Sequence, residues 1–146
     1  MFTSSKVKPR LVLDTNTIIS RLLVPSGVAA RAVDKALNEG VLLASDESLG
    51  ELADVLSRKK FDRYVSIQER QQFFQLLGGI VQIVRIHHRV IVCRDPKDDM
   101  LLQLALNGEA KMLITGDRDL VALAESFRTS HDLQILTPRA YLSLSL

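Results

Sequence analysis

The sequence predicts an α/β sandwich built around a mostly parallel sheet. Short apolar runs of strand length alternate with longer segments in which apolar residues recur at helical spacing. Glycine and proline turn signals separate these segments, and the chain contains no internal repeat. Strands that alternate with helices form parallel sheets. In such sheets the loops after the strands gather along one edge, where ligands bind.

Composition limits the class of protein. The chain has 146 residues, of which 47% are hydrophobic and 25% charged, and we expect one globular domain over 1–146 with a polar tail at 1–9. A formal net charge of +2 gives no general basic field, although a local cluster can still bind nucleic acid. The single cysteine, Cys93, excludes an internal disulfide and argues against structural zinc. The sequence shows no signal peptide and no apolar run of membrane-spanning length, so we expect a cytoplasmic protein.

The first half of the chain is predicted to contain two buried strands and four helices. The strands are compact apolar runs, and capping or turn residues bound the helices. In chain order we expect a strand over 10–14, a helix over 15–23 that stops at Pro25-Ser26-Gly27, a helix over 28–40 that ends in Gly40, a strand over 41–45, a helix over 48–61 and a helix over 66–80. Ser66 is expected to cap the last helix, and Gly78-Gly79 to close it.

The second half continues the alternation. The run VQIVRI predicts a strand over 81–86. In DPKDDMLLQLALNGEA, Asp95 suits an N-cap, Pro96 the first helical position and Gly108 the helix end. After this helix we expect a strand over 111–115, a turn and short helix over 116–124, a strand over 133–136 and a closing helix over 137–144.

Acidic residues stand near strand ends and helix starts. Asp14 ends the first strand, and Asp117 follows the strand over 111–115, with Asp119 close behind. Others lie in the first turns of helices, namely Glu51, Asp98 and Asp99. If the two strands are parallel and central, the carboxylates meet at one edge and repel one another unless a cation lies among them. Mg²⁺ or Mn²⁺, which prefer oxygen ligands, suit such a place.

Each acid also has a purely structural explanation. Asp14 can form a turn, Glu51 can be a solvated helix residue, and Asp117 and Asp119 can cap a short helix. Acids in the first turn of a helix are favoured by its dipole without any further role. Their convergence at one predicted edge is what indicates a functional site.

Four segments carry a family resemblance. LVLDTN, SLGELADVL, DPKDDMLLQLAL and AKMLITGDRDL, in this order, resemble the PIN-domain family of metal-dependent nucleases, and in particular its prokaryotic VapC-like subgroup of toxins from toxin–antitoxin pairs. The resemblance extends from Arg10 to Pro138. It implies a compact three-layer α/β/α sandwich with an acidic pocket for Mg²⁺ or Mn²⁺, cleavage of single-stranded RNA, and an antitoxin partner.

The resemblance also implies roles for single residues. The catalytic, metal-binding acids are then Asp14, Glu51, Asp99 and Asp117. The supporting residues are Asn16, which helps to order the first acid, Thr115 beside the fourth, and Asp119 as a further carboxylate. The third acid of the family precedes the threonine of the later strand by sixteen residues, which from Thr115 gives Asp99. Asp98 remains the second choice, because a one-residue insertion would change the count.

The expected reaction is phosphodiester hydrolysis by a water that one or two metal ions activate, giving 5′-phosphate and 3′-hydroxyl products. Candidate phosphate contacts are Arg21, Arg58, Lys59, Lys60 and Arg118, although cations at a helix C-terminus are also favourable without RNA. Aromatic residues make up 5% of the chain and tryptophan is absent, so no base preference is predicted.

Other functions remain as alternatives. A haloacid-dehalogenase-like phosphatase also begins with a strand and an aspartate, but needs an acid where Asn16 stands. An RNA-processing nuclease without an antitoxin would have the same sequence features, and so would a non-catalytic binding module that kept its acids. A ribonuclease using His87 and His88 is disfavoured, because neighbours on a strand point to opposite faces. The apolar runs FFQLL and YLSLSL suit a homodimer surface or the core equally well.

Overall fold

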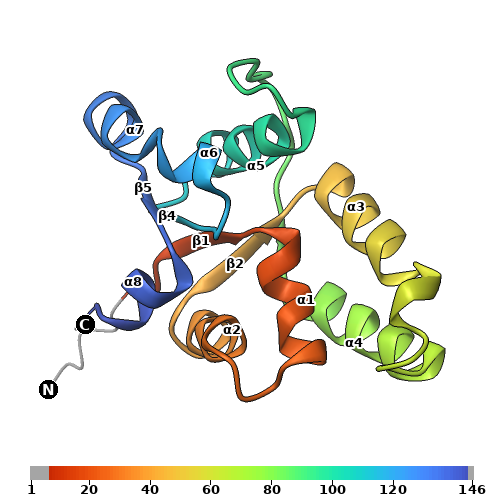
Figure 1. The fold of residues 1–146 in the computed structure, drawn as a ribbon. Helices are drawn as coiled ribbons and strands as arrows, with labels where there is room; N and C mark the ends of the chain where they lie inside the picture. The colour runs from red at the N-terminus through yellow and green to blue at the C-terminus, as the bar shows by residue number, and fades with distance from the viewer. Residues whose placement is uncertain (1–6, 145–146) are drawn as a thin grey trace, which may run out of the picture.

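A five-stranded parallel sheet forms the centre of the computed structural model, which describes residues 7–144. The strand order is β3-β2-β1-β4-β5, and every neighbouring pair is parallel (Figure 1). The strands are β1 (Arg10–Leu13), β2 (Val41–Ala44), β3 (Gln82–Ile83), β4 (Met112–Ile114) and β5 (Gln134–Leu136). The parallel sheet confirms the prediction. Most of the polar tail predicted over 1–9 lies outside the described residues.

Helices cover both faces of the sheet. They are α1 (Thr15–Leu23), α2 (Val28–Glu39), α3 (Asp46–Leu56), α4 (Ile67–Ile80), α5 (Pro96–Asn107), α6 (Arg118–Val121), α7 (Ala124–His131) and α8 (Pro138–Leu142). The core on one face contains residues of α1 to α4 and α8, and the core on the other contains residues of α5, α6 and α7. This arrangement is the three-layer α/β/α sandwich that the resemblance implied. Within residues 7–144, no helix has the length and apolarity to cross a membrane.

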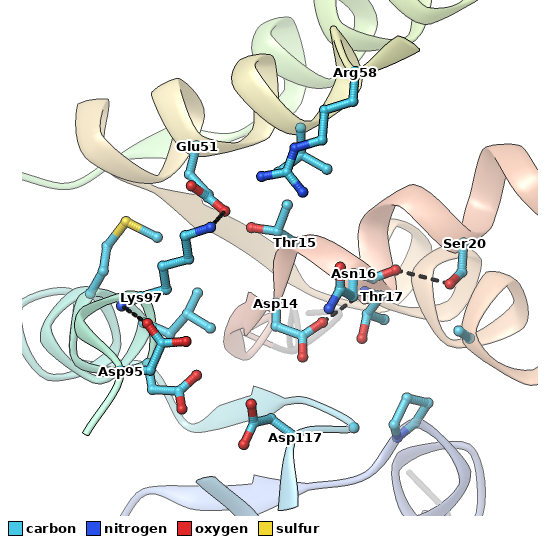
Figure 2. Close-up of a pocket in the computed structure, with 17 residues that line it drawn as sticks. Asp14, Thr15, Asn16, Thr17, Ser20, Glu51, Arg58, Asp95, Lys97 and Asp117 are labelled. Atoms are coloured by element: carbon cyan, nitrogen blue, oxygen red, sulfur yellow. Dashed lines mark hydrogen bonds and ion pairs between the residues drawn. The ribbon is translucent and has the colours of Figure 1, made fainter. Parts of the chain in front are cut away.

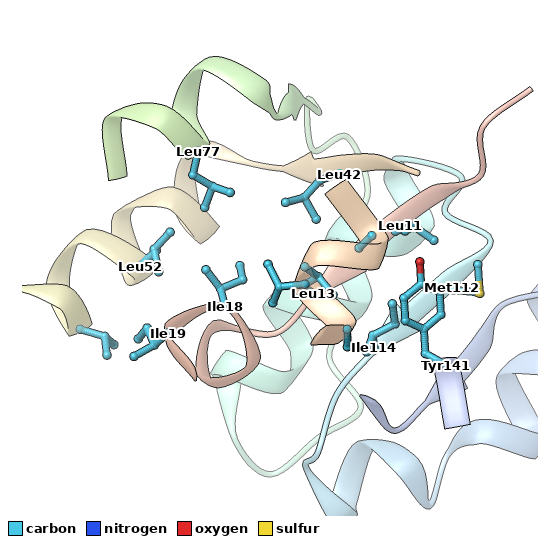
Figure 3. Packing of buried hydrophobic residues seen from close by; sticks show 14 of the residues in the cluster. Leu11, Leu13, Ile18, Ile19, Leu42, Leu52, Leu77, Met112, Ile114 and Tyr141 are labelled. Atoms are coloured by element: carbon cyan, nitrogen blue, oxygen red, sulfur yellow. The ribbon is translucent and has the colours of Figure 1, made fainter. Parts of the chain in front are cut away.

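The two cores arise from the alternation of side chains along the strands. In β1, Leu11 and Leu13 belong to one core and Val12 to the other, and all three are buried. Figure 3 shows Leu11 and Leu13 among the residues that pack between the sheet and the helices. A strand that is buried on both faces has a continuous apolar sequence, which is why the apolar run correctly predicted β1 as a buried strand.

Several predicted boundaries are wrong. The helix expected over 48–61 ends at Leu56, and a 3₁₀ turn, Lys59–Phe61, follows it. The strand expected over 81–86 has only two residues in the sheet. The glycine pair expected to close α4 lies inside this helix, which continues to Ile80. Helix α7 was not anticipated, because its sequence, AESFRTSH, has few apolar residues.

A buried arginine explains why α3 ends early. Arg70 of α4 is 4% exposed, and its Nη1 donates hydrogen bonds to the carbonyl oxygens of Leu56 (2.9 Å) and Arg58 (3.1 Å). Its Nη2 donates to Asp62 Oδ1. These bonds satisfy carbonyl groups that the end of a helix leaves without partners. Arg70 therefore fixes the turn between α3 and α4, from which Arg58 extends.

Gly40 and Gly50 form a matched pair for testing the packing of β1. A Cβ at position 40 would lie 2.4 Å from Leu11 Cδ1, whereas a Cβ at position 50 meets no atom within 4 Å. We expect Gly40→Ala to lower the free energy of unfolding by roughly 1–3 kcal/mol, since Leu11 must move within a packed core. Gly50→Ala, on the exposed side of α3, should instead raise it by about 0.5–1 kcal/mol. Urea denaturation measures both values, and equal effects of the two changes would contradict the packing described for β1.

Candidate active site

The candidate site lies at the carboxyl ends of the two central strands. Connections run from β1 outward through β2 to β3 on one side, and through β4 to β5 on the other. The strands before β4 are thus added on one side of β1, and β4 and β5 on the other, so the strand order reverses between β1 and β4. A crevice at such a point is the usual ligand site of a parallel sheet. A cavity of about 530 Å³ is found there, lined by residues of α1, α3 and α5 and of the segments after β1 and β4 (Figure 2).

Asp14, the first residue after β1, is held firmly in this cavity. It is 7% exposed, and its Oδ1 accepts a hydrogen bond from the Thr17 N–H (2.7 Å), which makes it the N-cap of α1. Its Oδ2 accepts a hydrogen bond from the Thr115 hydroxyl, at the end of β4. Thr115 therefore supports the first acid across the β1–β4 pair. Asn16 lines the cavity, but among the described residues the hydrogen bonds to the Asp14 carboxylate come from Thr17 and Thr115.

Asp117 approaches Asp14 from the neighbouring strand. Figure 2 shows both carboxylates pointing into the cavity. The Asp117 backbone N–H donates to Thr115 Oγ1 (3.0 Å), so a single threonine connects the two acids. Asp117 Oδ1 also accepts hydrogen bonds from the N–H groups of Asp119 (2.8 Å) and Leu120 (3.3 Å) and caps α6. The structural explanation of Asp117 is thus correct, and capping leaves its other oxygen available.

The third acid in the cavity is Asp98 and not Asp99. Asp98 is 6% exposed and lines the cavity. Asp99 is not among the described residues that line it, and its Oδ1 accepts hydrogen bonds from the N–H groups of Val92 (2.9 Å) and Cys93 (2.8 Å). The preference for Asp99, drawn from the count back from Thr115, is therefore replaced by the second choice. Asp99 instead ties the preceding loop to α5.

The spacing of apolar residues along α5 could have predicted that Asp98, and not Asp99, points into the cavity. Residues three, four and seven positions after Asp98 are Leu101, Leu102 and Ala105, all buried and apolar. The same positions after Asp99 include Gln103. Because such residues share one face of a helix, the apolar stripe indicates that Asp98 points inward.

The electrostatic environments of Asp98 and Asp99 differ. Burial, together with the nearby carboxylates of Asp117 and Asp95, raises the pKa of Asp98 to about 6. For Asp99, burial acts to raise the pKa, but the backbone hydrogen bonds from Val92 and Cys93 outweigh it and leave the pKa lowered. Asp98 is therefore the acid whose ionisation the surrounding protein opposes, and a cation beside it would relieve this cost.

The donor set fits a hard divalent ion. One carboxylate oxygen from each of Asp98, Asp117 and Asp119 can be chosen so that all three lie within 4.8 Å of one another. Oxygen ligands suit Mg²⁺ or Mn²⁺. The cavity lining, as far as the structure describes it, contains neither histidine nor cysteine, which are the usual zinc ligands.

Glu51 lies in the cavity but has a different neighbour. Its Oε1 is 3.3 Å from the Nζ of Lys97, at the start of α5. Figure 2 shows these two side chains pointing toward each other from α3 and α5. Glu51 was predicted from its sequence motif, whereas Lys97 was not predicted. No local sequence signal pairs Lys97 with Glu51, which lies 46 positions earlier in the chain.

The predicted phosphate contacts lie in different places. Arg58 lines the cavity, and its Nη2 is 3.7 Å from Asp54 Oδ2. Arg21 forms an ion pair with Asp34 at 2.7 Å. Outside the described lining lie Lys59, Lys60 and Arg118, all of them exposed. The structure thus brings one of the five predicted cations into the cavity.

Comparison with known proteins agrees with this architecture. An uncharacterized protein of Methanocaldococcus jannaschii, MJ1680, is 26% identical over 143 residues, covering 94% of this chain and 92% of the relative. A chain in the crystal structure of VapBC2 from Rickettsia felis bound to a DNA fragment from its promoter superposes with a TM-score of 0.58 at 13% identity, covering 88% of this chain and 98% of that one. A chain of VapBC-1 from nontypeable Haemophilus influenzae gives 0.55 at 18% identity, covering 89% and 98%. At these identities the solved structures show a shared fold.

The family is decided by a sequence match. A model of the PIN domain matches residues 10–119, which include β1, β4 and every acid discussed above. This match covers most of the chain. The chain belongs to the PIN domain family.

Proposed function

We propose that this protein is a Mg²⁺- or Mn²⁺-dependent endoribonuclease that cleaves single-stranded RNA. Membership of the PIN domain family supports a nuclease. The observation that carries the proposal is the group of carboxylates from Asp98, Asp117 and Asp119, beside the buried Asp14. Crowded acids at the carboxyl edge of a parallel sheet are costly unless they bind a cation.

The residues divide into holders of the ion and their supports. We assign Asp14, Asp98 and Asp117 as metal ligands, with Asp119 as a further carboxylate at the exposed side. A divalent ion bound here would lower the pKa of a water molecule and offset charge on the scissile phosphate. Thr115 and the Thr17 N–H orient Asp14, so that its carboxylate keeps one position in the cavity.

A nuclease is better supported than the alternative of a haloacid-dehalogenase-like phosphatase. A phosphatase of this type requires an acid at position 16, whereas the residue that lines the cavity at this position is Asn16. The family match also counts against it. An RNA-processing nuclease without an antitoxin would use the same acids. The toxin hypothesis and the RNA-processing hypothesis therefore differ only in whether an antitoxin binds the protein.

Cleavage of labelled single-stranded RNA tests the activity. With Mg²⁺ or Mn²⁺ we expect products that carry 5′-phosphate, and no cleavage in EDTA. Asp14→Asn and Asp98→Asn should each lower the rate roughly 100-fold or more, because each removes a charged metal ligand. Asp99→Asn is the matched control, since an amide oxygen can still accept hydrogen bonds from Val92 and Cys93, and its rate should stay within about tenfold of wild type. Equal losses at positions 98 and 99, or activity that survives EDTA and Asp14→Asn, would refute the assignment.

The raised pKa of Asp98 predicts how metal-free protein responds to pH. The group titrates near 6 when folded, above its ordinary value of 3.8. Its contribution to stability is thus complete below about pH 4 and is lost as the pH rises through about 6. Compared with Asp98→Asn, which stays neutral, the metal-free wild type should lose roughly 1–3 kcal/mol of unfolding free energy between pH 4 and pH 7. Denaturation in EDTA at both pH values measures this, and parallel pH profiles for the two proteins would contradict it.

We further propose that the protein is the toxin of a toxin–antitoxin pair. Support comes from the VapC-like motifs and from the shared fold with chains of two VapBC structures. A cognate antitoxin would cover the acidic cavity. Expression should then arrest growth, and co-expression of a protein encoded nearby should restore it. Expression without growth arrest would favour an RNA-processing role.

A homodimer is also proposed, with α4 as its surface. Leu76 and Ile80 on this helix are 65% and 56% exposed. The other run considered for a dimer, YLSLSL, begins with Tyr141, which is buried, and its last two residues lie outside the described part of the chain. Light scattering would measure the oligomeric state.

A further inference from the structure

Lys97 places a positive charge inside the acidic cavity. Its ammonium group is 3.3 Å from Glu51 Oε1, and both residues line the cavity (Figure 2). The Glu51 side chain is 17% exposed, whereas that of Lys97 is 56% exposed. The carboxylate is therefore largely enclosed by protein, while the ammonium group keeps a side open to solvent.

Local structure fixes the position of Lys97. Asp95 caps α5, and its Oδ1 accepts a hydrogen bond from the Lys97 N–H (3.0 Å). Pro96 restricts the backbone at the first helical position. Lys97 is thus held immediately before Asp98, and the ion pair connects the start of α5 with α3 across the cavity.

The acids that line the cavity fall into two groups. Asp98 and Asp117 belong to the group of converging carboxylates, whereas Glu51 does not. Glu51 is paired with Lys97, and Arg58 also lines the cavity nearby. A second divalent ion bound by Glu51 would have to displace the lysine, because an ammonium group already lies 3.3 Å from the carboxylate and would repel a dication bound there.

We propose that Lys97 takes the place of a second metal ion. It occupies Glu51 and directs its remaining N–H donors toward the substrate phosphate, so that the cavity binds a single divalent ion. An ammonium group has three donors, and one pairing with Glu51 leaves two for phosphate oxygens. This inference rests on the proposed metal-dependent nuclease function. Glu51 is then a positioning residue for Lys97 and not a metal ligand.

Counting bound Mn²⁺ tests the inference without reference to activity. Electron paramagnetic resonance of free Mn²⁺ during a titration gives the number of ions per chain. We expect one ion for the wild type and two for Lys97→Ala, in which Glu51 is released. Lys97→Arg should again bind one ion, because it keeps the charge. The matched control is Lys111→Ala, which removes an exposed lysine at the opposite edge of the sheet, before β4, and should also bind one ion.

The possible outcomes separate this inference from the proposed function. Two ions in the wild type, or any number other than two in Lys97→Ala, would overturn the role of Lys97 while leaving a metal site in place. No Mn²⁺ bound by the wild type would refute the proposed function, and the inference with it. Asp98→Asn should lower the affinity for the single ion at least about tenfold, which identifies the site that is counted.

A second measurement tests the contact with phosphate. In EDTA, binding of a single-stranded RNA oligonucleotide should be roughly fivefold to tenfold weaker for Lys97→Ala than for the wild type, because one charged contact is lost. Lys111→Ala should bind as the wild type does. Equal affinity of Lys97→Ala and wild type would show that Lys97 does not contact RNA.

Discussion

Repulsion among carboxylates at the carboxyl ends of β1 and β4 is the constraint on which the rest of the site depends. Asp14 and Asp117 follow the adjacent parallel strands β1 and β4, so the two acids meet at one edge of the sheet. Helix α5, which packs on one face of the sheet, adds Asp98 to the same cavity. Two kinds of contact offset the resulting charge: Asp14 accepts hydrogen bonds from Thr17 and Thr115, and Lys97 pairs with Glu51. Asp98 shows what is left uncompensated, since burial and the neighbouring carboxylates raise its pKa to about 6. A divalent cation would complete this compensation.

The structure around the cavity serves mainly to hold its groups in position. Thr115 connects Asp14 and Asp117, so the central strand pair determines the spacing of these acids. Asp95 sets the start of α5 and hence the places of Lys97 and Asp98. Farther away, Arg70 fixes the turn that carries Arg58. Asp14, Asp95 and Asp117 also cap helices, which explains why the sequence allowed a purely structural role for acids at these positions.

Local signals in the sequence predicted most of the fold. Apolar runs identified β1, β2 and β4, and the Asp95-Pro96 and Ser66 caps confirmed two helix starts. What failed depended on tertiary contacts. Helix α3 ends early because Arg70, fourteen residues after Leu56, binds the carbonyl group of its last residue and that of Arg58 just beyond it. Nothing in the local sequence marks α7 as a helix, because only Phe127 is buried within it.

The candidate site was predicted in part for the same reason. Asp14 and Asp117 follow strands directly, so parallel topology alone brings them together. The choice between Asp98 and Asp99 depends on the rotation of α5 about its axis, which a residue count does not give. Lys97 was missed because its partner, Glu51, lies 46 positions earlier in the chain, and only the packing of α3 against α5 joins them.

A crystal structure with Mn²⁺, located by anomalous scattering, is the most direct test of the metal site. We expect one anomalous peak among the carboxylates of Asp14, Asp98 and Asp117, with Lys97 still paired to Glu51. A peak beside Asp99, or no peak at saturating Mn²⁺, would contradict it.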